Sequence, residues 1–336
     1  MSLILEESKK MSKYVIETIR DVKDMELIEE QIADKITVFQ QASWLTVTGR
    51  DLFALVCRDE HNQIKGYLPL VKTSKYRVKS LHIPPYTPYF GPVIIESDLT
   101  KKMEIIEALV KKLSGEDHID FVLTLEDNDL LPYIKTGFTI EAKQTHICMR
   151  KEGFGAEDIH SSKRRYLKKL LAALDAGEIK VKRGKEAIAD LIALNHTTET
   201  RASFRGKDEV LKKLIEKNSE PDKTILVLYD DKGTPLAGAF CPRDKHTAYH
   251  LTNASARNEN SLLDKANILS TCLMIRNAFQ DGLNFDFEGS NIPGVANFYR
   301  MMGGKPRVNF RIQRSSSLFY SILRSAQRIR KEKNVS

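Results

Sequence analysis

The sequence predicts an α+β fold of mixed strands and helices, in which one structural unit occurs twice. The clearest unit is Leu283–Arg307, where Phe285 and Phe287 alternate with Asp286 and Glu288. A period of two is typical of a strand with one apolar face and one carboxylate face. A tight turn and a short helix that ends at two glycines follow, so two acids lie at the carboxyl end of a strand.

The second observation is that the same order of elements occurs earlier, at His118–Phe138. The interval from Asp120 to Asp286 equals the interval from Gly137 to Gly303. Two hairpin patterns with polar turns also match, Arg58–Leu70 in the first copy and Tyr229–Pro242 in the second. A repeat of this length indicates two copies of one domain.

The bulk properties suit two domains of ordinary size. The chain has 336 residues, of which 41% are hydrophobic, and a net charge of +8, which weakly favours a polyanionic partner. The scattered cysteines suggest reduced, buried thiols in a cytoplasmic protein: Cys57, Cys148, Cys241 and Cys272. No apolar run is long enough to cross a bilayer, and no signal peptide is evident. We therefore expect a cytoplasmic protein, with the inner membrane surface as an alternative location.

In the first copy, the patterns predict strands and helices at Tyr14–Arg20, Met25–Phe39 (helix), Phe53–Arg58, Ile64–Leu70, Val93–Ile95, Leu99–Leu113 (helix) and Ile140–Arg150. Between them lies Ile83–Pro92, in which four prolines alternate with Tyr86, Tyr89 and Phe90. Proline excludes a helix or a central strand here. We predict a rigid extended segment that exposes its aromatic rings, either at a domain junction or as the wall of a cleft.

In the second copy, the patterns predict elements at Ile179–Val181, Ala187–Thr200 (helix), Ile225–Tyr229, Ala237–Pro242, Ala248–Thr252 and Leu262–Phe279 (helix). A basic helix capped by serine begins at Ser161, and its charge fits a solvated face or a phosphate contact. Leu318–Lys333 is amphipathic and basic, which fits a docked helix with a frayed end or a contact with membrane or RNA.

Several chemistries lack their motifs. There is no Walker motif, no GxGxxG, no legible Ser-His-Asp or Cys-His arrangement and no metal-ligand spacing, so we predict neither a covalent enzyme nor a metal site. What remains is a set of cationic and aromatic residues near strand ends: Arg201, Arg205, Tyr249, His250, Tyr299, Arg300 and Lys305. Arginine recognises phosphate and carboxylate through paired hydrogen bonds. A ligand with such a group is therefore predicted, and each residue alone also fits a surface or packing role.

The two acids of the second copy have two possible roles. Either Asp286 or Glu288 could accept a proton from an attacking ammonium group. Either could instead accept backbone hydrogen bonds in the turn, and we favour this structural role for Asp286 while leaving Glu288 open. In a cleft, Tyr86 and Tyr89 would contact the substrate.

These features together resemble those of the FemAB-type transferases and the related CelD/BioF-like acetyltransferases, which are tandem GNAT-fold proteins. The matching features follow one another in order along the chain: Phe39-Gln40 with Trp44, Pro88–Pro92, Thr198 with Arg201 and Phe204, Tyr249 with Asn253–Ser255, Phe285–Ser290, and Phe298–Arg300 with Gly303-Gly304. The resemblance spans nearly the whole chain and depends on the order and spacing of these features.

The resemblance implies two GNAT-like domains, at residues 12–152 and 153–314, each with a splayed mixed sheet, and a C-terminal basic helix at residues 315–336. It implies transfer of an acyl or aminoacyl group to an amine, with acyl-CoA or aminoacyl-tRNA as co-substrate and no permanently bound cofactor. The acceptor would be a phosphate-bearing small molecule or a UDP-linked cell-wall precursor, held by Arg201 and Arg300.

We expect the acceptor amine to attack the bound ester or thioester directly. Backbone N–H groups around Tyr249–Leu251 would stabilise the oxyanion, which also makes Tyr249 a candidate catalytic residue, and Glu288 or a water would take the proton. The competing hypothesis is a non-catalytic protein that binds RNA or an anionic envelope polymer on a degenerate GNAT scaffold, since Lys163–Lys169 and the tail are basic. The fold alone does not decide between them.

Overall fold

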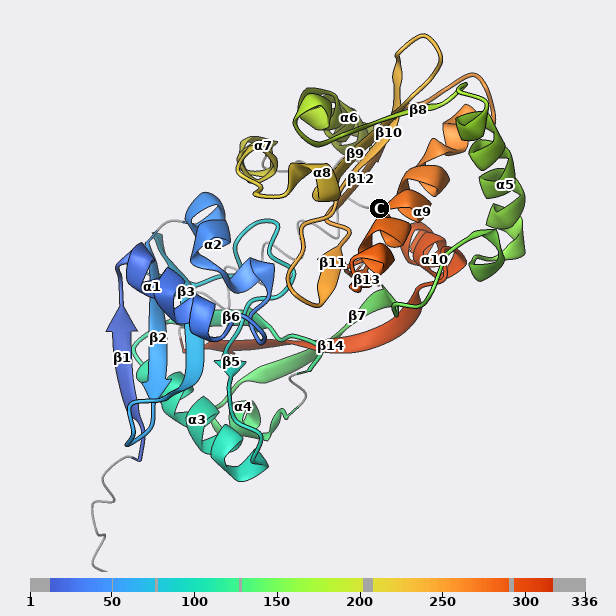
Figure 1. Cartoon of the computed structure of the whole chain (residues 1–336). Helices are drawn as coiled ribbons and strands as arrows, with labels where there is room; N and C mark the ends of the chain where they lie inside the picture. Colours follow the sequence, from blue (N-terminus) through green and yellow to red (C-terminus); the bar gives the residue numbers. More distant parts are fainter. Residues whose placement is uncertain are drawn as a thin grey trace, which may run out of the picture.

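The computed structural model describes residues 13–49, 51–75, 78–126, 129–201, 208–289 and 293–316. Within them the chain forms a ten-stranded sheet in the order β1-β2-β3-β4-β6-β14-β7-β13-β11, with β5 paired to β3, and a four-stranded sheet in the order β12-β10-β9-β8. The predicted mixture of strands and helices is confirmed, and Figure 1 shows it arranged as two halves joined by long strands.

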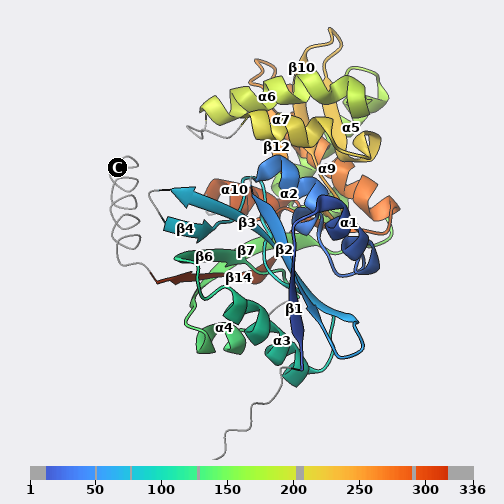
Figure 2. The same cartoon turned by 90° about the vertical axis from the view of Figure 1, so that its left-hand side faces the viewer.

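The first half contains seven strands and four α-helices within the described residues: β1 Val15–Ile19, α1 Val22–Gln31, α2 Ala42–Thr48, β2 Leu52–Arg58, β3 Ile64–Lys75, β4 Val78–Leu81, β5 Val93–Ile94, α3 Leu99–Lys112, β6 His118–Val122, α4 Leu131–Lys135 and β7 Thr139–Cys148. Helices α3 and α4 lie on one face of its strands, and α1 and α2 lie on the other (Figure 2). Asp98 caps α3 by accepting a hydrogen bond from Lys101 N–H.

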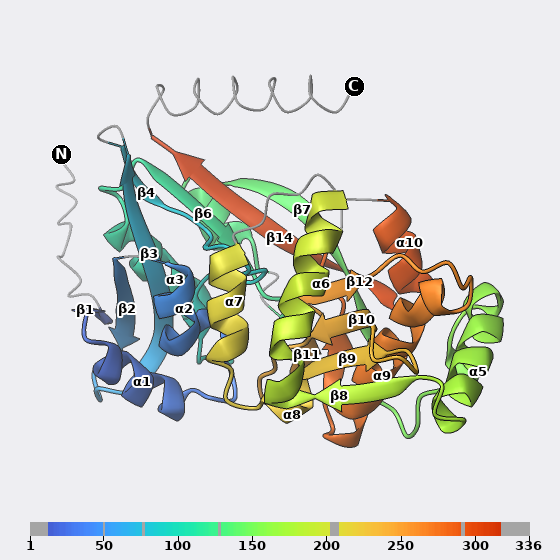
Figure 3. The same cartoon turned by 90° about the horizontal axis from the view of Figure 1, so that it is seen from above.

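The second half contains the remaining elements: α5 Ser161–Asp175, β8 Lys180–Arg183, α6 Ile188–Arg201, α7 Asp208–Glu216, α8 Pro221–Thr224, β9 Ile225–Tyr229, β10 Pro235–Phe240, β11 Thr247–Tyr249, β12 Thr252–Ser255, α9 Ala266–Gln280, β13 Asn284–Asp286, α10 Pro293–Met301 and β14 Lys305–Ser315. Helix α6 lies on one face of the four-stranded sheet and α9 on the other (Figure 3). Short 3-10 turns precede α2, α5, α6 and α9.

The two halves exchange strands. Strands β7 and β14 pair antiparallel along almost their whole length, from Lys305 opposite Ile147 to Gln313 opposite Thr139. The second part of β14 also pairs with β6, and the end of β7 also pairs with β13. In Figure 1, β14 (red) runs from the helices of the second half to the strands of the first. Each long strand therefore completes the sheet of the other half, so no single cut near residue 152 separates two independent sheets.

The predicted repeat is visible in the hydrogen bonding. Hairpins β2–β3 and β9–β10 are both antiparallel. Strand β4 pairs in parallel with β6 as β11 pairs in parallel with β13. At the interval that separates Asp120 from Asp286, Thr145 of β7 corresponds to Arg311 of β14. Each of these two residues binds the acid of the half that receives its strand, Thr145 to Asp286 and Arg311 to Asp120.

Four local predictions need correction. The helix predicted at Met25–Phe39 begins earlier and ends at Gln31. The cap of α5 is His160, whose ring accepts a hydrogen bond from Ser162 N–H, so no serine cap is present. The strand predicted at Ala248–Thr252 breaks after Tyr249, because β11 stays with β13 while β12 stays with β10.

The fourth correction concerns Ile83–Pro92, which forms no helix or strand, as predicted, but does not expose its rings. Tyr89 is 3% exposed and Phe90 is fully buried. The Trp44 indole donates a hydrogen bond to the Thr87 hydroxyl. Aromatic rings bury large apolar areas, and here Tyr89 and Phe90 pack inward although the prolines exclude a regular helix or central strand.

The predicted buried thiols are confirmed, since Cys57, Cys148, Cys241 and Cys272 are all buried and unbonded. A buried carboxyl in the first half was not predicted. Glu29 Oε1 accepts hydrogen bonds from Tyr67 Oη (2.6 Å) and Ala42 N–H (2.8 Å). Burial raises the pKa of Glu29 to about 7, although these two hydrogen bonds act to lower it.

Replacing Glu29 with glutamine should therefore remove a pH dependence of stability. The folded protein holds a proton on Glu29 up to about pH 7, while the unfolded chain releases it near pH 4.5. The stabilising contribution is thus complete below about pH 4.5 and is lost as the pH rises through 7. Between these values, urea unfolding should show the wild type losing up to about 3 kcal/mol relative to Glu29→Gln. Equal slopes for the two proteins would contradict this.

Candidate functional site

Asp286 organises the end of β13. It is 1% exposed. Its Oδ1 accepts hydrogen bonds from the Thr145 hydroxyl at 2.5 Å and from Glu288 N–H at 2.8 Å, and its Oδ2 accepts one from the Tyr89 hydroxyl at 2.5 Å. Burial raises the pKa of Asp286, and the three donors oppose this effect. With three donors already bound, Asp286 serves the structural role that the turn pattern favoured.

Glu288 is the carboxylate that remains available for chemistry. Its φ of 57° lies in the left-handed region that side-chain-bearing residues seldom adopt, and the bond to Asp286 holds it there. Within the described residues its Oε1 is buried without a hydrogen-bond partner, while the residue keeps part of its surface exposed. Burial, and then the charge of Asp286, raises the pKa of Glu288 well above its usual value. A carboxyl whose pKa is raised in this way is a candidate general base or acid.

Aromatic rings and a histidine form the apolar surroundings of this turn. Tyr299 stacks on Phe287 with ring centroids 4.7 Å apart, and His250 lies 5.7 Å from Phe287 and 6.5 Å from Tyr299. Burial lowers the pKa of His250 to about 3, so its imidazole is neutral at physiological pH. Neither ring nitrogen of His250 has a partner among the described residues.

His146 belongs to the same cluster and was not predicted. It lies on β7, a strand of the first half that pairs with β13 and β14 of the second half, and its ring is 6.0 Å from that of Tyr299. Burial, and then the nearby Arg300 guanidinium, lowers the pKa of His146. Both of its ring nitrogens are also buried and unpartnered within the described residues. No local sequence signal marks His146, because only the strand exchange brings it to this place.

The proposed oxyanion donors are not available. Tyr249 N–H donates to Pro242 O, His250 N–H to Asp286 O, and Leu251 N–H to Tyr249 O, each at 2.8 Å. The prediction that these three groups stabilise an oxyanion is therefore wrong. Where β11 and β12 part, these N–H groups donate to carbonyl groups of the chain itself, so they are not free to bind a substrate.

The strand that follows, β12, has one edge that pairs with no other strand among the described residues. Gly238 lies opposite Ala254 in the β10–β12 pair, and Ala256 N–H donates to Leu236 O. Because alternate residues of an antiparallel pair face the partner strand, the N–H of Asn253 points away from β10, toward the open edge of β12. The Asn253 side-chain oxygen is buried and unpartnered among the described residues.

A cavity of about 170 Å³ lies between the two halves and includes three residues of the predicted site, Tyr89, Tyr249 and Asp286. The Tyr249 hydroxyl donates to Asp244 at 2.6 Å, and its ring lies 5.9 Å from that of Tyr89. Burial, then Asp244, raises the pKa of Tyr249, so its hydroxyl stays protonated. The structure thus brings Tyr89, Tyr249, His250, Asp286 and Glu288 together.

The predicted cations are more dispersed. Arg300 and Lys305 are exposed, on α10 and at the start of β14. Tyr86 is half-buried against the first core with a φ of 55°. Arg205 lies outside the described residues, as does the predicted helix at residues 315–336 beyond Ser316; Arg201 ends α6, and its side chain is outside the description.

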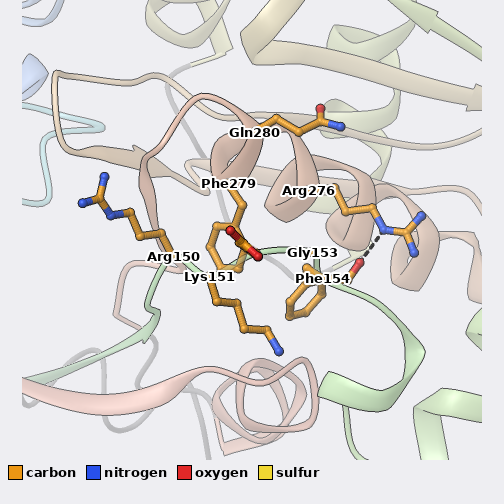
Figure 4. Close-up of a pocket in the computed structure, with 8 residues that line it drawn as sticks. Arg150, Lys151, Gly153, Phe154, Arg276, Phe279 and Gln280 are labelled. Carbon is orange, nitrogen blue, oxygen red and sulfur yellow. Dashed lines mark hydrogen bonds between the residues drawn. The ribbon is translucent and has the colours of Figure 1, made fainter.

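A second cavity, of about 610 Å³, is lined by residues 150–154 and by residues of α9 (Figure 4), and Glu288 is not among its lining residues. Its cations are committed to other groups: Arg150 Nη1 donates to Gly282 O at 2.9 Å, Arg276 Nε donates to Phe154 O at 2.6 Å, and Lys151 pairs with Asp158. In Figure 4, the Arg150 and Arg276 side chains point away from one another. The cavity therefore lacks the converging groups of a specific anion site.

A cluster of His82, His118 and Asp120 in the first half places possible metal-ligand atoms within 4.8 Å of one another. However, Arg311 donates from Nε and Nη2 to both oxygens of Asp120, at 2.8 and 2.6 Å. A divalent cation at this place would lie beside a fixed guanidinium, which opposes binding. We interpret the cluster as the surroundings of a buried ion pair.

Residues 160–298 match the family described as an acetyltransferase (GNAT) domain, and no curated protein matches the chain. Among solved structures, FemX has a TM-score of 0.66 at 12% identity, covering 88% of this chain and 96% of that chain. L-PGS from Bacillus licheniformis has a TM-score of 0.56 at 13% identity, covering 91% and 96%. The C-terminal domain of a putative lysylphosphatidylglycerol synthetase from Agrobacterium fabrum has a TM-score of 0.57 at 11% identity, covering 91% and 95%.

The family match identifies a GNAT domain at residues 160–298, and the fold of the described chain is that of a tandem GNAT protein. The similarity to FemX extends over most of the chain, so the fold that the resemblance to FemAB-type proteins implied is confirmed. Within the described residues, no helix has the length and apolar character needed to span a membrane.

Proposed function

We propose that the protein is an N-acyltransferase that moves an acyl or aminoacyl group from acyl-CoA or aminoacyl-tRNA to an amine, and that its second half carries the reaction. The observation that supports this most directly is Glu288. It places a carboxylate oxygen that is buried and has no hydrogen-bond partner among the described residues at the end of β13, beside the point where β11 and β12 part, inside the region that matches the GNAT family. A carboxyl with a raised pKa suits removal of a proton from an attacking ammonium group.

In this mechanism the acceptor nitrogen attacks the acyl carbonyl carbon. A C–N bond forms, and the C–S bond of a thioester or the C–O bond of an ester breaks. Glu288 takes the proton from nitrogen, and the leaving thiolate or alkoxide receives a proton from Glu288 or water. Asn253 N–H, at the open edge of β12, is the backbone donor that we assign to the developing oxyanion. The neutral rings of His250 and Tyr299 keep the site poor in competing charge.

The acceptor is an amine on a cell-wall or envelope precursor that carries phosphate, such as a UDP-linked muropeptide. Support comes from the exposed Arg300 on α10, near the strand-end cluster, and from the net charge of +8. Glu126, an exposed carboxylate that lines the 170 Å³ cavity, would attract the ammonium form of an acceptor.

The test is a ligand panel read by thermal shift and then by transfer. The arms are acetyl-CoA, a longer acyl-CoA, charged tRNA and a UDP-linked muropeptide, with desulfo-CoA and uncharged tRNA as matched controls. A donor at about 100 times its dissociation constant should stabilise the protein by about 2.7 kcal/mol. A transferred acyl group on the muropeptide amine identifies the donor. Salt-sensitive RNA binding with no transfer from any donor would instead support the non-catalytic alternative.

A further inference from the structure

The two halves differ at the position that we assign to catalysis. At the interval from Asp120 to Asp286, the residue that corresponds to Glu288 is Val122 of β6. Parallel pairing leads up to this point in both halves, with Leu81 opposite Ile119 in the first and Tyr249 opposite Asp286 in the second. The first half therefore has no acid–base side chain at the position equivalent to Glu288.

The connection that follows also differs. In the second half only His250 and Leu251 separate β11 from β12, and β12 pairs with β10 alone. In the first half, residues 82–92 separate β4 from β5, and β5 pairs with β3 as β12 pairs with β10. In the first half, the segment Ile83–Pro92 therefore lies where the two strand pieces part. The equivalent place in the second half has no such inserted segment.

This segment occupies the gap in the manner of a strand. Phe90 N–H donates to Val122 O at 2.8 Å, and Val122 N–H donates to Phe90 O at 2.9 Å. The Phe90 ring is fully buried and lies 6.1 Å from that of Phe121. At Gly91, a Cβ atom would lie 3.2 Å from Leu123, so the backbone approaches the sheet closely. The backbone at the end of β6, at Val122, is consequently unavailable to an external group.

The neighbouring residue of the same segment reaches the second half. Tyr89, 3% exposed, donates its hydroxyl hydrogen bond to Asp286 Oδ2, and Asp286 Oδ1 accepts the N–H of Glu288. Tyr89 thereby links the filled gap of the first half to the left-handed turn that carries Glu288.

We propose that Ile83–Pro92 is an internal plug of the first half, so that each chain binds one acyl donor, in the second half alone, and that Tyr89 is a positioning residue that orients Glu288 through Asp286. The proposal rests on the proposed function for the identity of the ligand. The position of Ile83–Pro92 as a plug does not depend on the ligand and can be tested without one.

The first experiment measures stoichiometry. Titration calorimetry with the donor that shifts the melting temperature, with CoA as the first probe, should give one equivalent per chain. Asn253→Trp, at the open edge of β12, should lose this binding, whereas Val93→Trp in β5 would leave the stoichiometry at one where the protein folds. Two equivalents, or full binding retained by folded Asn253→Trp, would overturn the proposal.

The second experiment needs no ligand. Hydrogen exchange of the wild type should show slow exchange at both Phe90 N–H and Val122 N–H, because each donates to the other residue. Fast exchange at both would refute the plug. If no donor binds the wild type, the proposed function fails, and this exchange measurement alone decides the plug.

The third experiment tests Tyr89 as a positioning residue. Tyr89→Phe should lower kcat about tenfold with little change in KM, and should move the pH midpoint of kcat. The matched control is Tyr67→Phe, which also removes a buried hydroxyl that donates to a buried carboxylate, Glu29, at 2.6 Å. The control should change stability but leave the pH profile in place. Identical pH profiles for Tyr89→Phe and the wild type would refute the positioning role.

Discussion

Glu288→Gln should reduce kcat by about 100-fold to 10,000-fold while leaving donor affinity nearly unchanged, because removal of a general base typically costs this much. Glutamine keeps the size and the buried oxygen of the side chain but does not accept a proton. The measurement is steady-state transfer with the donor and acceptor identified in the panel, together with calorimetric binding of the donor.

The pH dependence gives a second readout of the same substitution. Since burial, then Asp286, raises the pKa of Glu288, the base form appears only as the pH rises through that raised value. The kcat/KM of the wild type should therefore increase with pH in this range, and Glu288→Gln should lack this limb. Glu152→Gln is a control on another carboxylate, one that lines the 610 Å³ cavity and has no assigned role in the reaction. Unchanged turnover in Glu288→Gln would move the proton acceptor to water.

The sequence predicted the repeated unit well because local patterns carry it. Alternation around Phe285 and the matching pattern around Asp120 are properties of single strands, and the structure places both acids at equivalent strand ends. The sequence also allowed the site cluster to be predicted, because its members lie at or after strands that end at one edge of the sheet. These members are Tyr249, His250, Asp286, Glu288 and Tyr299.

What the sequence did not reveal depends on long-range pairing. Strands β7 and β14 have ordinary strand patterns, and nothing in either one indicates that each completes the other half. His146 and Thr145 enter the site only through that exchange. The exposure of Tyr89 was mispredicted for the same reason, because its partner Asp286 lies in the other half.

The prediction of a backbone oxyanion site was wrong because the N–H groups that it needed are already hydrogen-bonded within the chain. A strand that changes partners must still satisfy its N–H groups, and those of Tyr249, His250 and Leu251 find acceptors within the chain. The sequence did not indicate the break after Tyr249, and the acceptors that these N–H groups reach, such as Pro242 and Asp286, lie in other segments of the chain.

Arg311→Met should destabilise the protein by about 3 kcal/mol, since it removes one partner of a buried ion pair and leaves the other charge behind. Asp120 is 2% exposed, and both of its oxygens accept hydrogen bonds from the Arg311 guanidinium. This pair fastens the end of β14 between β6 and β7, so the loss should affect the first half as well as the strand. Urea unfolding measures the change.

The matched control is Arg307→Met, on the same strand but exposed, which should change the free energy of unfolding by no more than about 0.5 kcal/mol. The double variant Asp120→Asn/Arg311→Met should recover part of the loss, because no charge is then left buried. Equal effects of Arg307→Met and Arg311→Met would contradict the idea that this ion pair holds the exchanged strand. A large effect of Arg311→Met that the double variant does not reduce would assign the loss to the packing of the arginine stem instead.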